Sequence, residues 1–104
     1  MLKAIQLGRN SGLRVSRLCL GTMNFGTPGR GHQGDWTLGI DDARPIFRAA
    51  IEQGLFYFDC ADFYGIGACE ELVGQLLREL GPRDEYVLAT KISMPMGRGA
   101  NQGG

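Results

Sequence analysis

The chain has 104 residues, 43% of them hydrophobic, and its eleven basic side chains balance its eleven acidic ones. This length and composition indicate one small globular domain, and zero net charge argues against nucleic-acid or membrane-surface partners, which need a basic excess. Because there is neither an apolar run of membrane-spanning length nor the apolar core of a signal peptide at the start, we expect a cytoplasmic protein.

The first predicted structure in the chain is a hairpin. Residues 3–7 and 13–17 flank the cluster Gly8–Gly12, in which glycine and asparagine supply the positive φ angles of a tight reversal. Residues 18–22 then continue as a compact apolar strand that ends at Thr22. We assign residues 1–17 to the hairpin.

Residues 23–40 form a long glycine-rich loop, and loops of that length in compact domains are usually functional or disordered. Within it Gly29–Gly34 spells GxGxxG. The dinucleotide-binding form of this motif leaves a strand directly and opens a helix directly, which this segment does not do. We therefore do not expect a phosphate-binding loop here. His32 is interpreted as a solvated loop histidine, with substrate contact as the alternative.

Two helices are predicted by apolar stripes at helical spacing. The first is capped by Asp41 or Asp42 and ended by Gly54, and the second runs from about Cys69 to Leu80. Between them, residues 56–59 read as a short buried strand that ends in the carboxylate of Asp59.

A third strand of the sheet, residues 86–90, runs directly into Lys91. The tail, residues 97–104, has four glycines and no periodicity, so we expect a flexible loop or frayed end. Alternating strands and helices over residues 18–96 predict a parallel sheet with right-handed crossovers. Three strands and two helices cannot cover both faces of such a sheet, so the α/β fold is expected to be incomplete.

Three cysteines cannot all pair internally, and their spacing matches no zinc motif. We interpret Cys19, Cys60 and Cys69 as buried or semi-buried free thiols, in line with the strong burial tendency of this residue. We assign no catalytic role to any of them.

Polar side chains stand at or just beyond the predicted strand ends: Thr22, Asp59 with Tyr64, and Lys91. Parallel strands end on one side of a sheet, so these groups can converge there. An ammonium stabilises a phenolate and a carboxylate keeps that ammonium charged, which suits proton donation to a carbonyl oxygen while a hydride arrives from elsewhere. The alternative is a surface tyrosine, a capping aspartate and a solvated lysine.

Three stretches resemble the aldo-keto reductase family. Residues 7–26, LGRNSGLRVSRLCLGTMNFG, are similar to its opening hairpin and first barrel strand. Residues 58–74, FDCADFYGIGACEELVG, are similar to its signature, and residues 89–91, ATK, to its third-strand lysine. The long first loop with Trp36–Leu38 is most similar to bacterial members with an extended insertion there.

The resemblance implies a (β/α)₈ TIM barrel that binds NADP(H) at its C-terminal face and reduces aldehydes or ketones to alcohols. It also implies that Tyr64 is the proton donor, Lys91 its ammonium partner, and Asp59 the partner of that lysine beside the nicotinamide. Thr22 and Met23 match the segment that touches the nicotinamide ribose and the substrate pocket.

The resemblance covers only the hairpin and the first three strands and two helices of a barrel that needs about 250 residues. The family's catalytic histidine follows the fourth strand, and its phosphate-binding strands come last. We therefore expect the rest of the barrel to be required and residues 1–104 alone to be inactive. The alternative is a non-catalytic binding or regulatory member, or a truncated remnant.

Overall fold

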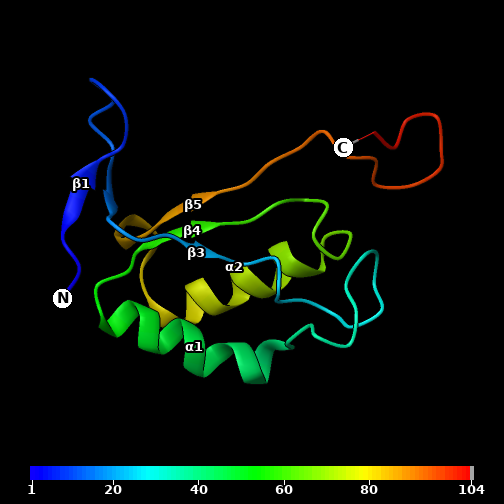
Figure 1. Ribbon diagram of the computed structural model, residues 1–104, viewed down its shortest axis with the longest axis horizontal. Helices are drawn as coiled ribbons and strands as arrows, with labels where there is room; N and C mark the ends of the chain where they lie inside the picture. The colour runs from blue at the N-terminus through cyan, green and yellow to red at the C-terminus, as the bar shows by residue number, and fades with distance from the viewer. Residues whose placement is uncertain (104) are drawn as a thin grey trace.

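The computed structural model describes residues 1–103 and shows strands and helices in the predicted order (Figure 1). The elements are β1 (Ala4–Gln6), β2 (Arg14–Ser16), β3 (Leu20–Gly21), α1 (Ile40–Glu52), β4 (Tyr57–Asp59), α2 (Ala68–Leu80), the 3₁₀ helix η1 (Arg83–Glu85) and β5 (Val87–Ala89). The strands are shorter than the apolar runs predicted, and η1 was not predicted.

The strands form two separate sheets. β1 pairs antiparallel with β2, which confirms the hairpin. β3, β4 and β5 form a parallel sheet in that order, with Asp59 in register with Gly21 on one side and Ala89 on the other. Because the three strands run the same way, the residues that follow them meet at one edge of the sheet.

Both helices lie on the same side of the parallel sheet (Figure 1). The core is between these layers: Phe47 of α1 is fully buried, stacks on Phe58 of β4 at 5.6 Å between ring centroids, and meets Phe25 edge-on at 5.2 Å. The buried face of α2 adds Leu72, Val73, Leu76 and Leu77. No helix covers the other face of the sheet, and the described residues do not close a barrel.

The predicted cap of α1 is wrong. Its N-cap is Gly39, and neither aspartate caps the helix with its side chain. The backbone N–H of Ala43 donates to the carbonyl of Gly39, so helical hydrogen bonding begins earlier and places Asp41 and Asp42 inside the first turn. Their carboxylates still lie near the positive end of the helix dipole.

The tail forms a closed turn within the described residues rather than a frayed end. Pro95 forms an antiparallel bridge with Gly103, and the N–H of Met96 donates to the carbonyl of Gln102 at 2.6 Å. The last residue of the predicted flexible tail, Gly104, lies outside the described residues.

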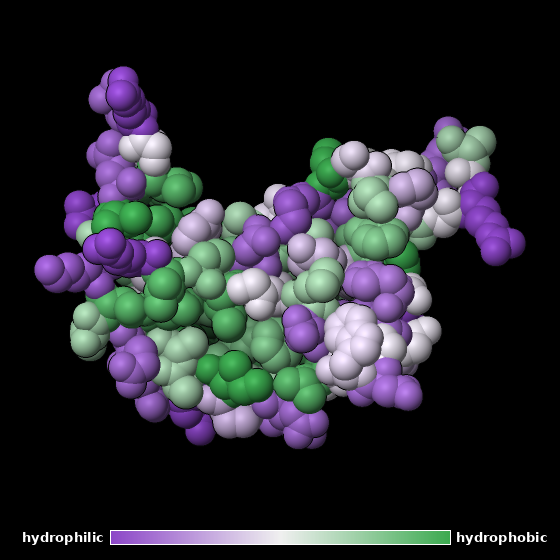
Figure 2. All heavy atoms as spheres, viewed as in Figure 1, coloured by the Kyte–Doolittle hydropathy of each residue, from purple (hydrophilic) through white to green (hydrophobic). Residues whose placement is uncertain are grey.

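Figure 2 shows hydrophilic side chains on the hairpin tip and the tail, while hydrophobic ones gather where the base of the hairpin meets the helical layer. The outline is hollowed along the upper edge, between hairpin and tail. Among residues 1–103, no helix combines the length and apolar character needed to cross a membrane.

Candidate active site

The end of the parallel sheet carries an ion pair. Lys91, two residues after β5, donates from Nζ to Oδ2 of Asp59 at 2.8 Å and to the carbonyl oxygen of Cys60 at 2.7 Å. The backbone supports this pairing, because the N–H of Asp62 donates to the Lys91 carbonyl. The side chains of Lys91 and Asp59 are 48% and 41% exposed, so the pair is open to solvent.

Tyr64 completes the predicted trio. The ammonium of Lys91 lies 5.0 Å from the centroid of the Tyr64 ring. Tyr64 is half-buried in the turn between β4 and α2, where Gly65, Ile66 and Gly67 all have positive φ angles of 61°, 50° and 91°. This left-handed turn reverses the chain so that the tyrosine lies beside the strand ends. The structure therefore brings Asp59, Tyr64 and Lys91 together.

The environment favours a charged lysine. Burial lowers the pKa of Lys91, but the hydrogen bond to Asp59 and the contact with Tyr64 outweigh it, so the pKa is raised above its ordinary value. The site therefore holds a permanent positive charge next to a phenol throughout the physiological pH range. The backbone carbonyl of Cys60 as a partner of this ammonium was not predicted, since backbone acceptors leave no signal in a sequence.

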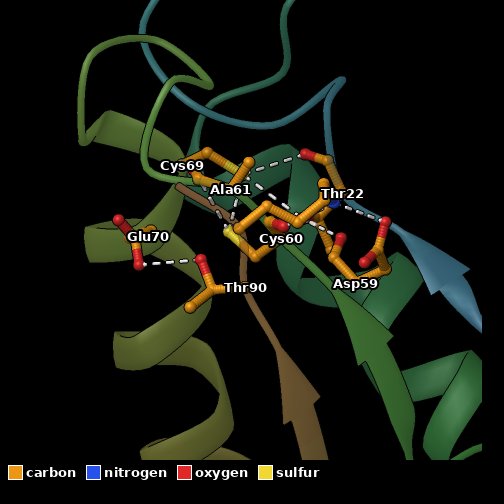
Figure 3. Close-up of polar contacts among 8 residues, drawn as sticks. Thr22, Asp59, Cys60, Ala61, Cys69, Glu70 and Thr90 are labelled. Carbon is orange, nitrogen blue, oxygen red and sulfur yellow. Dashed lines mark hydrogen bonds and ion pairs between the residues drawn. The ribbon is translucent and has the colours of Figure 1, made fainter. Parts of the chain in front are cut away.

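Thr22 occupies the base of the site rather than its surface. Its hydroxyl donates to the carbonyl of Asp59 at 2.8 Å, and its side chain is fully buried (Figure 3). Met23, the next residue, is 46% exposed. Thr22 thus fixes the end of β4 from inside the fold, and Met23 is the accessible one of the two residues predicted to touch a cofactor.

A further hydrogen bond ties the site to the helical layer. The hydroxyl of Thr90 donates to Oε2 of Glu70 in the first turn of α2 at 3.1 Å (Figure 3). Thr90 directly precedes Lys91, so this contact fixes the end of β5 against α2. It gives Glu70 a specific structural partner in addition to its favourable place near the helix N-terminus.

The cysteines divide into two kinds, all with free thiols. Cys60 and Cys69 are buried behind the site, as predicted, whereas Cys19 is exposed and the prediction for it is wrong. Burial nonetheless raises the pKa of the Cys19 thiol, with Asp59 adding to the effect.

The long first loop lies against the site. His32 is exposed but stacks flat on Phe63 at 5.1 Å between centroids and meets Tyr64 edge-on at 6.2 Å. The solvated-histidine prediction is therefore correct for exposure and incomplete for contact. The guanidinium of Arg30 adds a hydrogen bond to the carbonyl of Ile66 at 2.9 Å.

Two of the three glycines in Gly29–Gly34 pack closely against other side chains, whereas Gly29 has open space at its Cβ position. A Cβ on Gly31 would lie 2.9 Å from the side chain of Ile66, and one on Gly34 would lie 3.0 Å from the indole of Trp36. No helix opens at the motif, because α1 begins only at Ile40. These contacts give the motif an architectural role and agree with the sequence-based rejection of a phosphate cradle.

Gln33 is the residue of this loop that the sequence did not single out. Its side chain is 2% exposed, donates to the carbonyls of Met23 and Phe25 at 3.1 and 2.8 Å, and accepts from the N–H of Thr27 at 3.0 Å. A Cβ on Gly65 would lie 2.1 Å from its amide oxygen. One buried amide thus holds the loop together by hydrogen bonds, and its oxygen packs against Gly65 in the turn that carries Tyr64.

Known proteins match this arrangement over most of the chain. The model of the aldo/keto reductase family matches residues 17–103. Aldo-keto reductase YhdN of Bacillus subtilis is 38% identical over 87 residues, which are 82% of this chain and 24% of that protein. Norsolorinic acid reductase stcV of Emericella nidulans is 39% identical over 89 residues, which are 81% and 21% of the two chains.

A solved structure agrees with these relatives. The holo form of aldo-keto reductase AKR11C1 from Bacillus halodurans superposes with a TM-score of 0.74 and 34% identity, covering 99% of this chain and 30% of that one. The chain therefore spans about a quarter of the length of its curated relatives and a somewhat larger share of the solved structure. Sequence signature, strand order and superposition agree, and the chain belongs to the aldo/keto reductase family.

Proposed function

We propose that this chain carries the proton-donating part of the active site of an NADP(H)-dependent reductase that converts small aldehydes or ketones to alcohols. The observation that supports this most directly is the position of the Lys91 ammonium, 2.8 Å from Asp59 and 5.0 Å from the Tyr64 ring centroid. Family membership supports the reductase class, and the substrate and the choice of nucleotide belong to the proposal. The cytoplasmic location expected from the sequence stays a prediction.

Asp59, Tyr64 and Lys91 have different roles in the transfer of one proton. Tyr64 donates its phenolic proton to the carbonyl oxygen of the substrate, and Lys91 stabilises the phenolate that remains. With the 5.0 Å from Lys91 Nζ to the Tyr64 ring centroid taken as the separation of the two charges, they attract by roughly 3 kcal/mol at an effective dielectric constant of about 20, and by less than about 1 kcal/mol in water. Because Lys91 is half-exposed, a value between these limits applies.

Asp59 and the Cys60 carbonyl orient the ammonium. Both accept hydrogen bonds from Nζ at 2.8 and 2.7 Å, so the lysine is held at the strand ends instead of extending into solvent. The hydroxyl of Thr22 donates to the backbone carbonyl of Asp59 and so holds this residue in place. The positive charge is therefore in place before the phenolate forms, which reduces the reorganisation that the reaction requires.

The residues present fit the reactive end of a nicotinamide cofactor. Met23 offers an exposed side chain next to the buried Thr22, and Asp59 and Lys91 are open to solvent on the same edge of the sheet. We propose Thr22, Met23 and Asp59 as the residues of this chain that border the nicotinamide and its ribose, with Thr22 acting through the strand end that it fixes. The bound NADPH would supply the hydride.

The test uses a chimera, because the chain spans only part of its relatives. Residues 1–103 would replace the corresponding segment of AKR11C1, and NADPH oxidation would be followed with a panel of aldehydes and ketones. We expect Tyr64→Phe to reduce kcat at least about 100-fold, as for loss of a general acid. Tyr86→Phe is the matched control, since Tyr86 lies at the other end of β5, beside Arg83.

Full activity of the Tyr64→Phe chimera would refute the assignment of the proton donor. An inactive but folded parent chimera would instead favour the non-catalytic alternative. For the 104-residue chain itself we expect no NADPH binding at low micromolar concentration, because the glycine-rich motif neither leaves a strand nor opens a helix, and Gly31 and Gly34 pack against neighbouring side chains. Saturable quenching in a fluorescence titration of the chain with NADPH would contradict this expectation.

A further inference from the structure

We propose that Cys60 and Cys69 form an oxidisable thiol pair that closes to a disulfide directly behind the candidate active site. Their sulfur atoms lie 3.5 Å apart, and both residues are buried, at 1% and 0% exposure. Cys60 follows Asp59 at the end of β4, and Cys69 lies in the first turn of α2. The proposal is independent of the reductase activity, since it concerns the chemistry of the thiols themselves.

The geometry requires little movement. A disulfide has an S–S bond of about 2.05 Å, so the sulfurs must approach by about 1.5 Å. The intervening turn contains Gly65 and Gly67, whose positive φ angles show that the chain here is built from conformationally permissive residues. The third thiol, on Cys19, is exposed, whereas the two thiols of the pair are enclosed together. The fold therefore selects one of the three pairings that three cysteines allow.

The two thiols are also chemically unequal. Hydrogen bonding with Cys69 lowers the pKa of Cys60 to about 7, against burial and the nearby carboxylate of Glu70, which both raise it. The same hydrogen bond and burial raise the pKa of Cys69. While both thiols are protonated, Cys60 donates to the Cys69 sulfur and Cys69 donates to the carbonyl of Thr22 at 3.0 Å; when Cys60 ionises, the Cys69 thiol becomes the donor to the Cys60 thiolate. Cys60 is thus the thiol that ionises, and Cys69 keeps its proton.

The oxidant must be small because both thiols are buried, and a hydroperoxide such as hydrogen peroxide meets this requirement. The Cys60 thiolate attacks one peroxide oxygen, the O–O bond breaks, and the released hydroxide takes up a proton to give water. The Cys69 sulfur then attacks the resulting sulfenic acid, its proton leaves with the hydroxyl group as a second water, and the S–S bond forms. Two thiols and one peroxide give one disulfide and two waters.

Oxidation would change the contacts that support the candidate active site. The Cys69 sulfur lies 3.0 and 3.3 Å from the carbonyl and hydroxyl oxygens of Thr22, and that hydroxyl holds the Asp59 carbonyl (Figure 3). The carbonyl of Cys60 itself accepts from Lys91. Drawing the sulfurs together weakens the contacts of Cys69 with Thr22 and shifts the backbone that Lys91 contacts.

The test treats the native 104-residue chain with hydrogen peroxide, traps the remaining thiols with an alkylating reagent and maps disulfides by mass spectrometry. We expect a loss of two of three thiols, a single Cys60–Cys69 linkage, and Cys19 still alkylated. Cys19→Ser is the matched control and should give the same linkage, whereas Cys60→Ser and Cys69→Ser should give none. A chain oxidised in urea should form mixed linkages that include Cys19.

Two kinds of result would overturn the proposal. One is native oxidation that links Cys19 as readily as the buried pair, or that ends in sulfinic acid on Cys60 with Cys69 still free. The other is an oxidised chain in which the NMR resonances of the Lys91 side chain are unchanged, which would refute the link to the site. The wild-type chain alone yields both measurements, so neither depends on the folding of a variant.

Discussion

Replacing Gly65 by alanine tests how the first loop is joined to the turn that carries Tyr64. A Cβ at this position would lie 2.1 Å from the amide oxygen of Gln33 and 2.7 Å from its carboxamide carbon. Gln33 is enclosed on all sides, so it cannot move aside without giving up its hydrogen bonds. The substitution should therefore expel this amide from its site.

The expected cost has two parts. An alanine at a left-handed position costs about 1–2 kcal/mol, which applies here because φ of Gly65 is 61°. Expelling Gln33 breaks its hydrogen bonds to Met23, Phe25 and Thr27, each worth about 1 kcal/mol. Together these give a loss of about 4–5 kcal/mol in the free energy of unfolding.

Gly67→Ala is the matched control, because Gly67 lies in the same turn at φ 91° but has nothing within 4 Å of its Cβ position. It should lose only the backbone contribution of about 1–2 kcal/mol. Urea unfolding followed by fluorescence of Trp36, the single tryptophan and itself part of the loop, measures both variants. Equal losses in the two variants would show that Gln33 does not hold the turn.

Phe47→Ala should lower the free energy of unfolding by about 3–5 kcal/mol, because Phe47 is fully buried between Phe25 and Phe58, whereas Ile46→Ala on the exposed side of α1 should cost far less. A hydrogen bond from Arg44 lowers the pKa of Glu79, so Arg44→Ala should raise it in an NMR titration, and the stability difference between the two proteins should vanish as pH falls through the folded-state pKa. Asp59→Asn should lower the raised pKa of Lys91, measured by NMR, and the stability that this raised pKa contributes should be lost as pH rises through the folded-state pKa of that lysine.

Much of the fold follows from local sequence patterns. The spacing of Phe47 with its apolar neighbours requires a helix with one buried face, and α1 has that face. The run that ends at Asp59 reads as a buried strand, because a carboxylate is not tolerated further into the core. The placement of Asp59 and Lys91 at the ends of neighbouring parallel strands then follows from topology, and their ion pair confirms it.

Local sequence patterns predicted the structure less well where backbone groups, and not side chains, form the deciding hydrogen bonds. Asp41 and Asp42 are good capping residues, but the helix begins at the backbone of Gly39. The tail has no periodicity, and its closure by a bridge between Pro95 and Gly103 comes from backbone groups that carry no sequence identity. In each case the deciding hydrogen bond is formed by atoms that every residue has.

By itself the sequence determined the order of strands and helices, the parallel sheet, and the candidate trio of Asp59, Tyr64 and Lys91. Only the tertiary structure decided that Gln33 is the buried anchor of the first loop and that the thiols of Cys60 and Cys69 lie 3.5 Å apart. The physical reason is that periodicity reports which face of an element is buried. Which side chains meet across elements depends on the path of the loops, and here left-handed turns at Gly65 and Gly67 set that path.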